Sequence, residues 1–445
     1  MKKQILVIGA GRSSKVLIDY LLDHAEYNNW FVTLADYEEK NAINLIRSSK
    51  YGKAIFFDVN NNDMRFSEIN KSDIVVSMLP ASLHVLVAKD CITLSKDMVT
   101  ASYISNDLYS LKSQIESKNI LFLNEIGLDP GIDHMSAMNV IDEIKKDGGE
   151  LISFKSFCGG LIHPENDNNP WNYKFTWNPR NVVLAGKGTA KYLNNNVYKN
   201  ISYNRVFEDV SHVSILNEGD FEAYPNRDSL KYIDIYGLQG IETMIRGTLR
   251  RKGFCSSWDI FVKLGMTDDS NIIKNNDNMT YSDYINYFLP DNDSFSVEEK
   301  FCTYLNISRD SEQFRKMEWL GLFSNNKILL DEFTSADLLQ YILEEKFTLD
   351  VNDKDMVVMQ HQFRYKINGI ELERHSSLIV YGDDQNQTAM AKTVGLPLAI
   401  AVKLILNGDI NVKGLCIPIS KDIYKNILIE LEQYGIAFKE EFISH

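Results

Sequence analysis

The sequence predicts an α/β protein with a doubly wound parallel sheet, a second α/β domain and a small helical insertion. Three observations support this prediction. Short apolar runs rich in β-branched residues alternate with helix-like segments over residues 1–126, which is typical of parallel strands joined by helices. Alternating strand patterns follow from about Gly149. Helical periodicity with few β-branched runs then extends from Thr267 to Phe347.

The first strand, Ile5–Ile8, leads directly into the turn Gly9-Ala-Gly11 and then into helical apolar spacing. A dinucleotide fingerprint requires this context. Gly9 permits the tight turn, and Gly11 lets the backbone approach the pyrophosphate at the helix N-terminus. Ser14 takes the third glycine position, a departure from the motif, but it is small enough for close packing. A Rossmann-type domain is therefore predicted, with its cofactor held by Gly9, Gly11, Arg12, Ser13 and Ser14.

The second strand, Phe31–Ala35, ends in Asp36. An acidic residue at this point binds the ribose 2′-hydroxyl of NAD and repels the 2′-phosphate of NADP. No arginine follows in Tyr37-Glu-Glu39 to bind that phosphate. The sequence therefore favours NAD over NADP. The alternative is that Asp36 is only a solvated turn residue.

Further strand–helix units complete the parallel sheet. Their carboxyl ends are predicted to line the cofactor, with Asp58 near the adenine and with Ser77, Met78 and Leu79 at the nicotinamide end. The predicted strands are Ala54–Phe57, Asp73–Leu79, Met98–Thr100 and Ile120–Leu123.

A ten-residue loop, Glu125-Ile-Gly-Leu-Asp-Pro-Gly-Ile-Asp-His134, follows the last of these strands. It contains three carboxylates and one imidazole, and open sheets bind ligands where their strands end. Its two glycines and its proline exclude a simple helix or strand. The loop is either part of a ligand site or a capped strand-to-helix turn. Asp133 and His134 lie on the first predicted helical turn, where we expect them to cap and support it.

The region after Gly149 contains a candidate anion site. The strand Leu151–Phe157 ends in Cys158-Gly-Gly160, and the glycines suggest a close backbone approach. Trp171–Arg180 interleaves aromatic and basic residues, which could form a ligand wall or an aromatic core. Two further basic segments are Ala223–Ser229 and Arg246–Arg251. Arginine binds carboxylates bidentately, so several anchors indicate a substrate with several carboxylates; surface salt bridges are the alternative.

Two elements are predicted near the C-terminus. Asn368-Gly369, between two apolar runs, predicts a β-hairpin. Thr393–Gly408 predicts a buried helix with a glycine stop, packed back on the first domain. The predicted domains are the Rossmann domain at 1–126, completed by 388–445, the substrate domain at 127–266 and 348–387, and the helical subdomain at 267–347.

Composition limits the function classes. The chain has 445 residues, of which 44% are hydrophobic and 24% charged. Its net charge of −14 argues against nucleic acid or an anionic membrane as partner. Five cysteines without CxxC spacing predict a reducing compartment and no metal site. The sequence contains no run of about 18 consecutive apolar residues, so no transmembrane span is predicted. We therefore expect a cytoplasmic protein that binds a small molecule. The sequence is compatible with a homodimer but does not determine the number of subunits.

Seven segments together resemble the saccharopine dehydrogenase family of the glutamate-forming type, also called saccharopine reductase. The resemblance runs from residue 1 to beyond residue 410. The loop at 125–134 and the Pro-Asn-Arg-Asp segment are its specific parts. The segments, in family order, are Gly9-Ala-Gly11, Val99–Tyr103, Asn124–His134, Ser156–Leu161, Tyr173–Trp177, Tyr224–Ser229 and Arg246–Arg250.

The resemblance implies an oxidoreductase of lysine metabolism that acts on a CH–NH bond. Saccharopine, water and NAD(P)+ would give L-glutamate, α-aminoadipate semialdehyde and NAD(P)H. Asp129, Tyr103 and Cys158 become the candidate acid/base groups, and Thr176 a cofactor residue. The residues implied around the substrate are Ser102, Tyr103, Asp129, Arg227, Thr248, Leu249 and Arg250.

Three questions remain open at this point. Fungal members of the family use NADP and carry an arginine after the second strand, whereas Asp36 stands here. A carboxynorspermidine-type reductive condensation is an alternative reaction, although a polyamine would need acidic walls rather than arginines. A dinucleotide-binding sensor without catalysis is an alternative from another class, and it gives no reason for the arginines and Asp129 to occur together.

Overall fold

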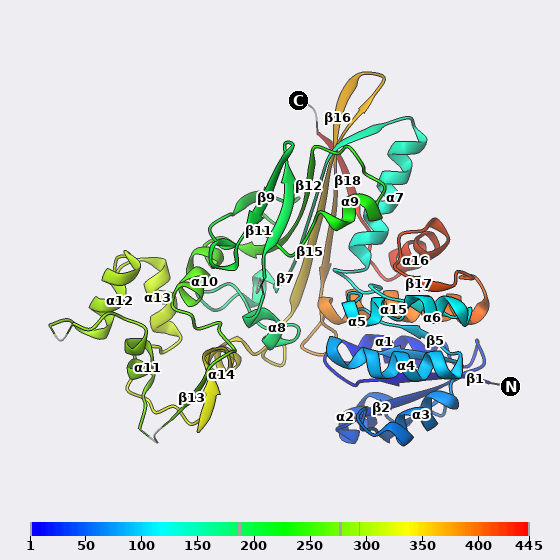
Figure 1. Ribbon diagram of the computed structural model, residues 1–445, viewed down its shortest axis with the longest axis horizontal. Coiled ribbons are helices and arrows are strands. Elements are labelled where there is room, and N and C mark those ends of the chain that lie inside the picture. Colours follow the sequence, from blue (N-terminus) through cyan, green and yellow to red (C-terminus); the bar gives the residue numbers. More distant parts are fainter. Residues whose placement is uncertain (1, 186–187, 276–277, 293, 444–445) are drawn as a thin grey trace.

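The computed structural model describes residues 2–185, 188–275, 278–292 and 294–443. The first domain lies at the lower right of Figure 1, the helical region at the left, and a long second sheet between them. The predicted α/β class is confirmed, because a parallel sheet with helices on both faces is joined to a mixed sheet.

The first sheet has seven parallel strands in the order β17-β6-β5-β4-β1-β2-β3. The order reverses between β1 and β4, the switch point where such sheets bind ligands. The predicted strand runs are confirmed. The strands are β1 (Lys3–Ile8), β2 (Trp30–Asp36), β3 (Gly52–Phe56), β4 (Ile74–Ser77), β5 (Asp97–Val99), β6 (Leu121–Leu123) and β17 (Gly414–Cys416).

Helices cover both faces of this sheet because both faces of its strands are apolar. One apolar core contains residues of α1 and α15, and a separate core on the other face contains residues of α4 and α6. The helices are α1 (Ser14–Asp23), α2 (Glu39–Ile46), α3 (Asn62–Asn70), α4 (His84–Leu94), α5 (Asn106–Tyr109), α6 (Lys112–Ser117), α15 (Ala389–Asn407) and α16 (Lys421–Gln433).

The second sheet is mixed and follows the order β10-β11-β12-β7-β15-β16-β18, with β8 and β9 attached to β12. β12 and β7 are parallel, and β15 runs antiparallel to β7. The strands are β7 (Glu150–Ile162), β8 (Ala190–Asn194), β9 (Val197–Ile201), β10 (Ser211–Ser214), β11 (Asp220–Pro225), β12 (Thr243–Arg251), β15 (Asp355–Ile367), β16 (Ile370–Tyr381) and β18 (Lys439–Ile443).

Two predictions about single elements near the C-terminus are confirmed. β15 and β16 form the expected hairpin, whose turn residues Asn368 and Gly369 both have positive φ, as a tight hairpin turn requires. The apolar helix is α15, and it ends at Gly408, which has a φ of 81°. α15 lies against α1, because a Cβ on Gly395 would stand 2.8 Å from the backbone nitrogen of Leu17.

α15 is long and apolar enough to meet the length and composition criteria for a membrane span. In the structure, 72% of that window is buried inside the protein. The apolar composition of α15 is therefore explained by its position as a core helix between the two domains.

The helical region has an apolar core of its own. Trp171, Tyr173 and Phe175 are fully buried in this core, so the aromatic segment serves mainly as core packing. The elements here are α8 (Pro179–Val183), α10 (Phe254–Lys263), β13 (Ile272–Lys274), α11 (Tyr281–Tyr287), α12 (Val297–Leu305), α13 (Glu312–Trp319), β14 (Glu332–Thr334) and α14 (Ser335–Phe347).

The C-terminal segment differs from the expectation in one respect. Residues 388–445 were expected to complete the first domain, and α15, α16 and β17 do lie with it. β18, however, pairs with β16 at the edge of the second sheet. Its five residues are all exposed, so they lack the apolar periodicity that could have predicted this pairing.

Candidate active site

The loop Glu125–His134 lies between the two sheets and connects β6 to α7 (Ile132–Lys146). A Cβ on Gly131 would stand 2.1 Å from the carbonyl oxygen of Gly127, so only glycine fits this turn. Glu125 has a φ of 56°, an unusual backbone conformation for this residue type. Such positions cluster where a shape is fixed for function.

Glu125 and His134 hold the loop to its surroundings. The backbone N–H of Glu125 donates to the carbonyl of Ser102, and its carboxylate accepts from Ile104 N at 3.2 Å. His134 contacts this carboxylate at 2.9 Å and Tyr236 Oη at 2.6 Å. Burial opposes the charge on Glu125, but His134 outweighs it and holds the pKa of Glu125 below its ordinary value. This buried pair therefore stabilises the backbone of the segment that carries Ser102 and Tyr103.

One guanidinium joins the two aspartates of the loop. Arg246, on β12, contacts Asp129 Oδ1 at 2.7 Å and also pairs with Asp133 Oδ2. Tyr103 donates from Oη to the same Asp129 oxygen at 3.0 Å. Asp133 was expected to cap and support the helix, and it does accept from Gly131 N at 2.6 Å. The ion pair with Arg246 is an additional contact that the sequence did not indicate.

The two aspartates differ in exposure and in proton affinity. The Asp129 side chain is 18% exposed, whereas that of Asp133 is 1% exposed. Burial raises the pKa of Asp129, although Arg246 opposes the rise. Burial also acts on Asp133, but His134 and Arg246 lower its pKa overall. Asp133 is thus the permanent counter-ion of Arg246, and Asp129 is the carboxyl group suited to exchange a proton.

Cys158 is buried on β7, directly opposite Thr248 of β12. Burial raises the pKa of this thiol well above its ordinary value, and the nearby carboxylates add to the rise. The thiol is therefore protonated at neutral pH and unsuited to act as a base. Thr248 accepts from the side-chain amide of Asn226 at 3.0 Å.

Strand alternation divides the predicted substrate residues of β12. Arg246, Thr248 and Arg250 share one face of the strand, because side chains two residues apart point to the same side. Leu249 points to the other face, where it packs with Phe157 in a separate apolar core. The side chain of Leu249 therefore lies on the face away from Arg250, and a role of Leu249 around the substrate stays a prediction for its backbone.

Arg250 is a buried cation without a carboxylate partner among the described residues. It is 3% exposed, its Nη1 donates to the carbonyl of Leu249 at 2.9 Å, and its Nε has no hydrogen-bond partner. Aromatic rings surround it, with centroids at 5.0 Å (Tyr173), 5.2 Å (Phe254) and 5.9 Å (Tyr224). Ring faces stabilise a guanidinium only in part, so the site is suited to an incoming anion.

Two further cations flank the ring of Tyr103. The guanidinium of Arg227 lies 4.8 Å from the ring centroid, and the ammonium of Lys231 lies 5.3 Å from it. Arg227 has a φ of 50°, so its backbone is held in a sparsely populated conformation. Burial lowers the pKa of Lys231, and Arg246 and Arg227 lower it further, although nearby carboxylates oppose them. Within the described residues, neither Arg227 nor Lys231 forms an ion pair.

Most of the predicted cofactor residues lie at the carboxyl ends of β1 and β4. Gly9 has a φ of 109°, and a Cβ there would stand 2.9 Å from the carbonyl oxygen of Met78. A Cβ on Gly11 would meet nothing within 4 Å, so this turn is open on its outer side. Ser14, at the third glycine position, donates to the Gly9 carbonyl at 2.9 Å, and this bond compensates for the departure from the motif.

The first turn of α1 carries no side-chain cap, so its N–H groups are suited to a phosphate. Arg12 is exposed and Ser13 half-buried at this turn. Asp36 accepts from Ala10 N at 2.6 Å and from Glu38 N at 2.8 Å, which places its carboxylate beside the glycine turn.

The remaining predicted cofactor residues are also placed by the fold. Ser77 is fully buried, whereas Met78, Leu79 and Asp58 are half-buried at the ends of their strands. Thr176 is buried, and its hydroxyl has no hydrogen-bond partner among the described residues. A buried hydroxyl without a partner is costly unless a ligand or water satisfies it.

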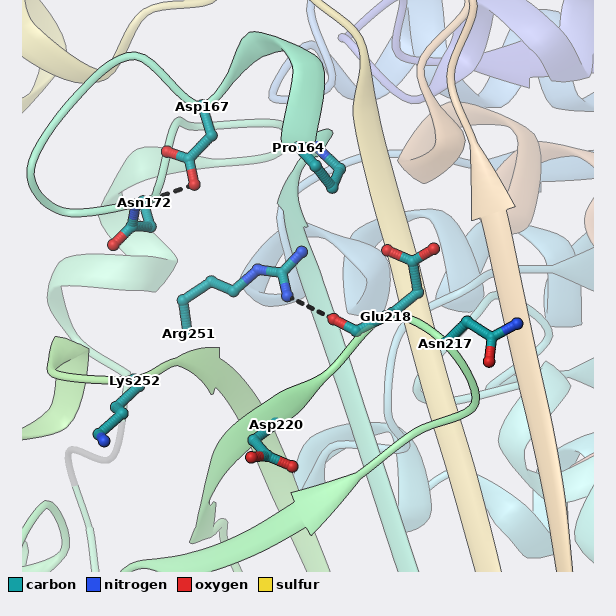
Figure 2. Close-up of a pocket in the computed structure, with 8 residues that line it drawn as sticks. All are labelled: Pro164, Asp167, Asn172, Asn217, Glu218, Asp220, Arg251 and Lys252. Carbon is teal, nitrogen blue, oxygen red and sulfur yellow. Dashed lines mark hydrogen bonds between the residues drawn. The ribbon is translucent and has the colours of Figure 1, made fainter.

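A second pocket lies on the opposite side of the second sheet from the candidate site. Arg251 follows Arg250 in the sequence, but its side chain points to the opposite face, where it donates to the carbonyl of Glu218 at 2.9 Å. Figure 2 shows Arg251 among the residues that line this pocket, Pro164, Asp167, Asn172, Asn217, Glu218, Asp220 and Lys252. None of the residues predicted around the substrate lines it.

Sequence reasoning missed three side chains that the fold brings to the site. Arg246 was noted only as part of a basic segment, Lys231 was not noted, and His84 has no motif. His84 lies within hydrogen-bonding distance of both Ser77 and Ser102. The alternation of β12 could have separated Arg246 from Arg251, but no local signal identifies the other two. Among the described residues, no group of three metal-ligating side chains occurs.

Comparison with known proteins covers nearly the whole chain. Residues 5–123 match the model described as the saccharopine dehydrogenase NADP binding domain, and residues 127–436 match the saccharopine dehydrogenase C-terminal domain. The chain is 37% identical over 453 residues to the Saccharomyces cerevisiae saccharopine dehydrogenase [NADP(+), L-glutamate-forming], with 100% of both chains covered.

Two further comparisons agree with these. The apo saccharopine dehydrogenase (L-Glu forming) of Saccharomyces cerevisiae superposes with a TM-score of 0.88 at 35% identity, covering 99% of this chain and 100% of that one. The mitochondrial alpha-aminoadipic semialdehyde synthase of Bos taurus is 36% identical over 98% of this chain. The chain spans about half the length of that relative, 47%.

Proposed function

The chain belongs to the saccharopine dehydrogenase family, and from this membership we propose that it catalyses the reversible oxidation of saccharopine. Saccharopine, water and a nicotinamide dinucleotide in its oxidised form give L-glutamate, α-aminoadipate semialdehyde and the reduced dinucleotide. The names of the relatives supply the reaction class, and the chemistry of the candidate site supports it independently.

The observation that carries the proposal is the set of unpaired cations. Saccharopine has three carboxylates. Arg250 is buried without a carboxylate partner among the described residues, and the exposed side chains of Arg227 and Lys231 each lie against the ring of Tyr103 without ion pairs there. Burial lowers the pKa of Lys231, and Arg246 and Arg227 lower it further, so these cations repel one another. The buried charge of Arg250 is costly without a partner. Three carboxylates would neutralise all three cations. A polyamine would meet repulsion instead, so the carboxynorspermidine-type reaction fits less well.

Asp129 is the group we assign to proton transfer. The contacts from Tyr103 and Arg246 both fall on its Oδ1, which leaves Oδ2 without a hydrogen bond from the described residues. Oxidation requires the secondary amine of the substrate to lose a proton first, and Oδ2 can accept it. The same proton can return to the departing amine of glutamate after water has added. Tyr103 stays protonated, because burial raises its pKa well above the ordinary value, and it acts as a donor.

The residues of the first domain fit a dinucleotide. The positive φ of Gly9, the open side of Gly11 and the uncapped first turn of α1 form a cradle for its phosphates. A bound nicotinamide would supply the hydride acceptor for the substrate carbon next to nitrogen. Residues Ser77, Met78 and Leu79 would hold that end.

For the choice of cofactor we propose NAD. The relatives' names give NADP(+), and this preference is a property of those proteins. In this chain the Asp36 carboxylate stands beside the glycine turn, where a 2′-phosphate would be repelled. Wild type should therefore have the higher kcat/KM with NAD. Asp36→Ala should reduce the ratio of kcat/KM with NAD to kcat/KM with NADP. Glu39→Ala, which changes an exposed carboxylate nearby, should leave this ratio unchanged. A wild-type preference for NADP would overturn this assignment.

The decisive assay measures reduced dinucleotide formed from saccharopine, with NAD and NADP in parallel. Arg250→Met should raise the saccharopine KM by about 100-fold, because a buried charge-assisted pair is lost. Arg251→Met is the matched control, since its side chain points to the opposite face, and it should leave KM unchanged. Turnover of a carboxylated polyamine without turnover of saccharopine would contradict the proposal. Tight cofactor binding with no turnover of either would indicate a sensor instead.

A further inference from the structure

A buried histidine links the cofactor side of the site to the substrate side. His84 is the first residue of α4, which follows β4, and it is 3% exposed. Its Nδ1 lies 2.8 Å from Ser77 Oγ, and its Nε2 lies 2.7 Å from Ser102 Oγ. The hydroxyl of Thr100 lies 3.4 Å from the same Nε2 and accepts from the backbone N–H of Ser102. One imidazole thus contacts three hydroxyl groups.

The ring is neutral at working pH. Burial lowers the pKa of His84 to about 4. The first turn of a helix disfavours a positive charge as well. A neutral imidazole donates from one nitrogen and accepts at the other. The position of its single proton therefore decides which way the neighbouring hydroxyl groups point.

Ser77 indicates where this proton lies. Its hydroxyl is fully buried, and in the part of the chain that the structure describes it contacts His84 and no other acceptor. If His84 donated from Nδ1, the hydrogen of Ser77 would be buried without an acceptor, which is costly. If Ser77 donates to Nδ1 instead, at 2.8 Å, both groups are satisfied, and only the weaker contact of the Thr100 hydroxyl, at 3.4 Å from Nε2, loses its acceptor. The imidazole proton then lies on Nε2, from which it is donated to Ser102 Oγ.

This arrangement sets the direction of the Ser102 hydroxyl. Because the Ser102 oxygen already accepts from His84, its own hydrogen is free to be donated to a ligand. We propose that His84 is a positioning residue that holds Ser102 as a hydrogen-bond donor to a carboxylate of the substrate. The proposal rests on the proposed function, because it takes Ser102 to contact saccharopine.

Two substitutions of the same residue separate the two contacts. The amide nitrogen of glutamine reaches the place of Nε2, so His84→Gln should keep the donor to Ser102. The shorter side chain in His84→Asn reaches only the place of Nδ1, so it should lose that donor. The saccharopine KM should rise about tenfold in His84→Asn, because one hydrogen bond is lost. It should stay within about threefold of wild type in His84→Gln. The cofactor KM, measured separately, shows whether the Ser77 contact matters.

A double-mutant cycle excludes a merely structural role. Ser102→Ala should raise the saccharopine KM, and adding His84→Asn should have no further effect, because both changes remove the same hydrogen bond. Additive effects, or equal effects of His84→Asn and His84→Gln, would overturn the proposal. If wild type does not oxidise saccharopine, the proposed function and the role of His84 fall together.

The tautomer can be read in the wild-type enzyme, so the test does not depend on how well the variants fold. Nitrogen-15 NMR of histidine-labelled protein, with the His84 signal assigned by its loss in His84→Gln, should show a neutral ring protonated at Nε2 from pH 5 to 8. A ring protonated at Nδ1, or a charged ring in this range, would overturn the proposal.

Discussion

At the scale of single residues, the site depends on how Arg246 divides its charge between Asp129 and Asp133. Asp129→Asn removes the proton acceptor while keeping a similar shape. It should lower kcat by a factor of about 10² to 10⁴ with a small change in cofactor affinity, as steady-state kinetics would show. An Asn variant with wild-type kcat would exclude Asp129 from proton transfer.

The pH dependence of kcat/KM is a second test of Asp129 and its contact with Arg246. Saccharopine oxidation requires Asp129 without its proton, so kcat/KM should fall as the pH drops through the pKa of this group. Burial raises that pKa and Arg246 lowers it. Removing the guanidinium in Arg246→Met should therefore move the acid limb of the profile to higher pH, whereas Arg246→Lys should move it less. An unchanged limb in Arg246→Met would show that another group titrates.

Lys231 is the cation that sequence reasoning did not identify, and a neighbouring lysine provides its control. Lys231→Met should raise the saccharopine KM by about tenfold, because one carboxylate would lose its partner. Lys191 pairs with Asp228 at 4.0 Å beside the same loop, so Lys191→Met removes an equal charge nearby. Equal effects of the two substitutions would show that general electrostatic attraction, rather than a contact, is responsible.

At the scale of elements, the contact between α1 and α15 has no room for an added methyl group. Alanine normally stabilises a helix relative to glycine by about 1 kcal/mol. At Gly395, however, a Cβ would stand 2.8 Å from the backbone nitrogen of Leu17. Gly395→Ala should therefore lower the free energy of unfolding by about 1–3 kcal/mol in urea denaturation. Gly11→Ala, whose Cβ would meet nothing within 4 Å, is the matched control and should leave stability unchanged.

Elements with local signals could be predicted from the sequence. The strands of the first sheet, the Asn368-Gly369 hairpin and α15 each have periodicity, a turn motif or a glycine stop within one short window. β18 has none of these, and its partner β16 lies more than 60 residues away. Leu249 stays a predicted substrate residue, although strand alternation puts its side chain on the opposite face from Arg250.

The site was predictable where one motif carries its own chemistry, as at Asp129 and the glycine turn. It was not predictable where distant segments meet. His84 contacts Ser102, which lies 18 residues further along the chain, and Arg246 contacts Asp133 across 113 residues. Neither contact leaves a spacing pattern, because the sheets create it. Folding alone brings these side chains together.

At the scale of the whole molecule, Asp355 connects the two domains, and we expect it to make the stability of the folded protein depend on pH. From β15 its carboxylate accepts from Ala389 N at 2.5 Å and Met390 N at 3.1 Å, at the start of α15. Burial raises its pKa from 3.8 to about 6. Because the folded protein holds this proton more tightly than the unfolded chain, the contribution to stability is complete below pH 3.8 and is lost as the pH rises through 6.

Urea denaturation of wild type and Asp355→Asn at several pH values tests this sign. Relative to the variant, the free energy of unfolding of wild type should decrease from pH 4 to pH 6, at up to about 1.4 kcal/mol per pH unit. Asp409→Asn, which changes an exposed carboxylate, controls for the altered net charge. A difference between wild type and Asp355→Asn that is constant over this range would contradict the prediction.

The split of the first domain between the two ends of the chain has a consequence for synthesis. β1 to β6 are complete by Leu123, yet the helix that covers α1 begins at Ala389 and the edge strand beside β6 at Gly414. On the ribosome, the apolar side of α1 therefore stays uncovered while about 270 further residues are made, at roughly 5–20 residues per second. This interval exposes the nascent chain to aggregation, and chaperones that bind apolar helices should recognise it during translation.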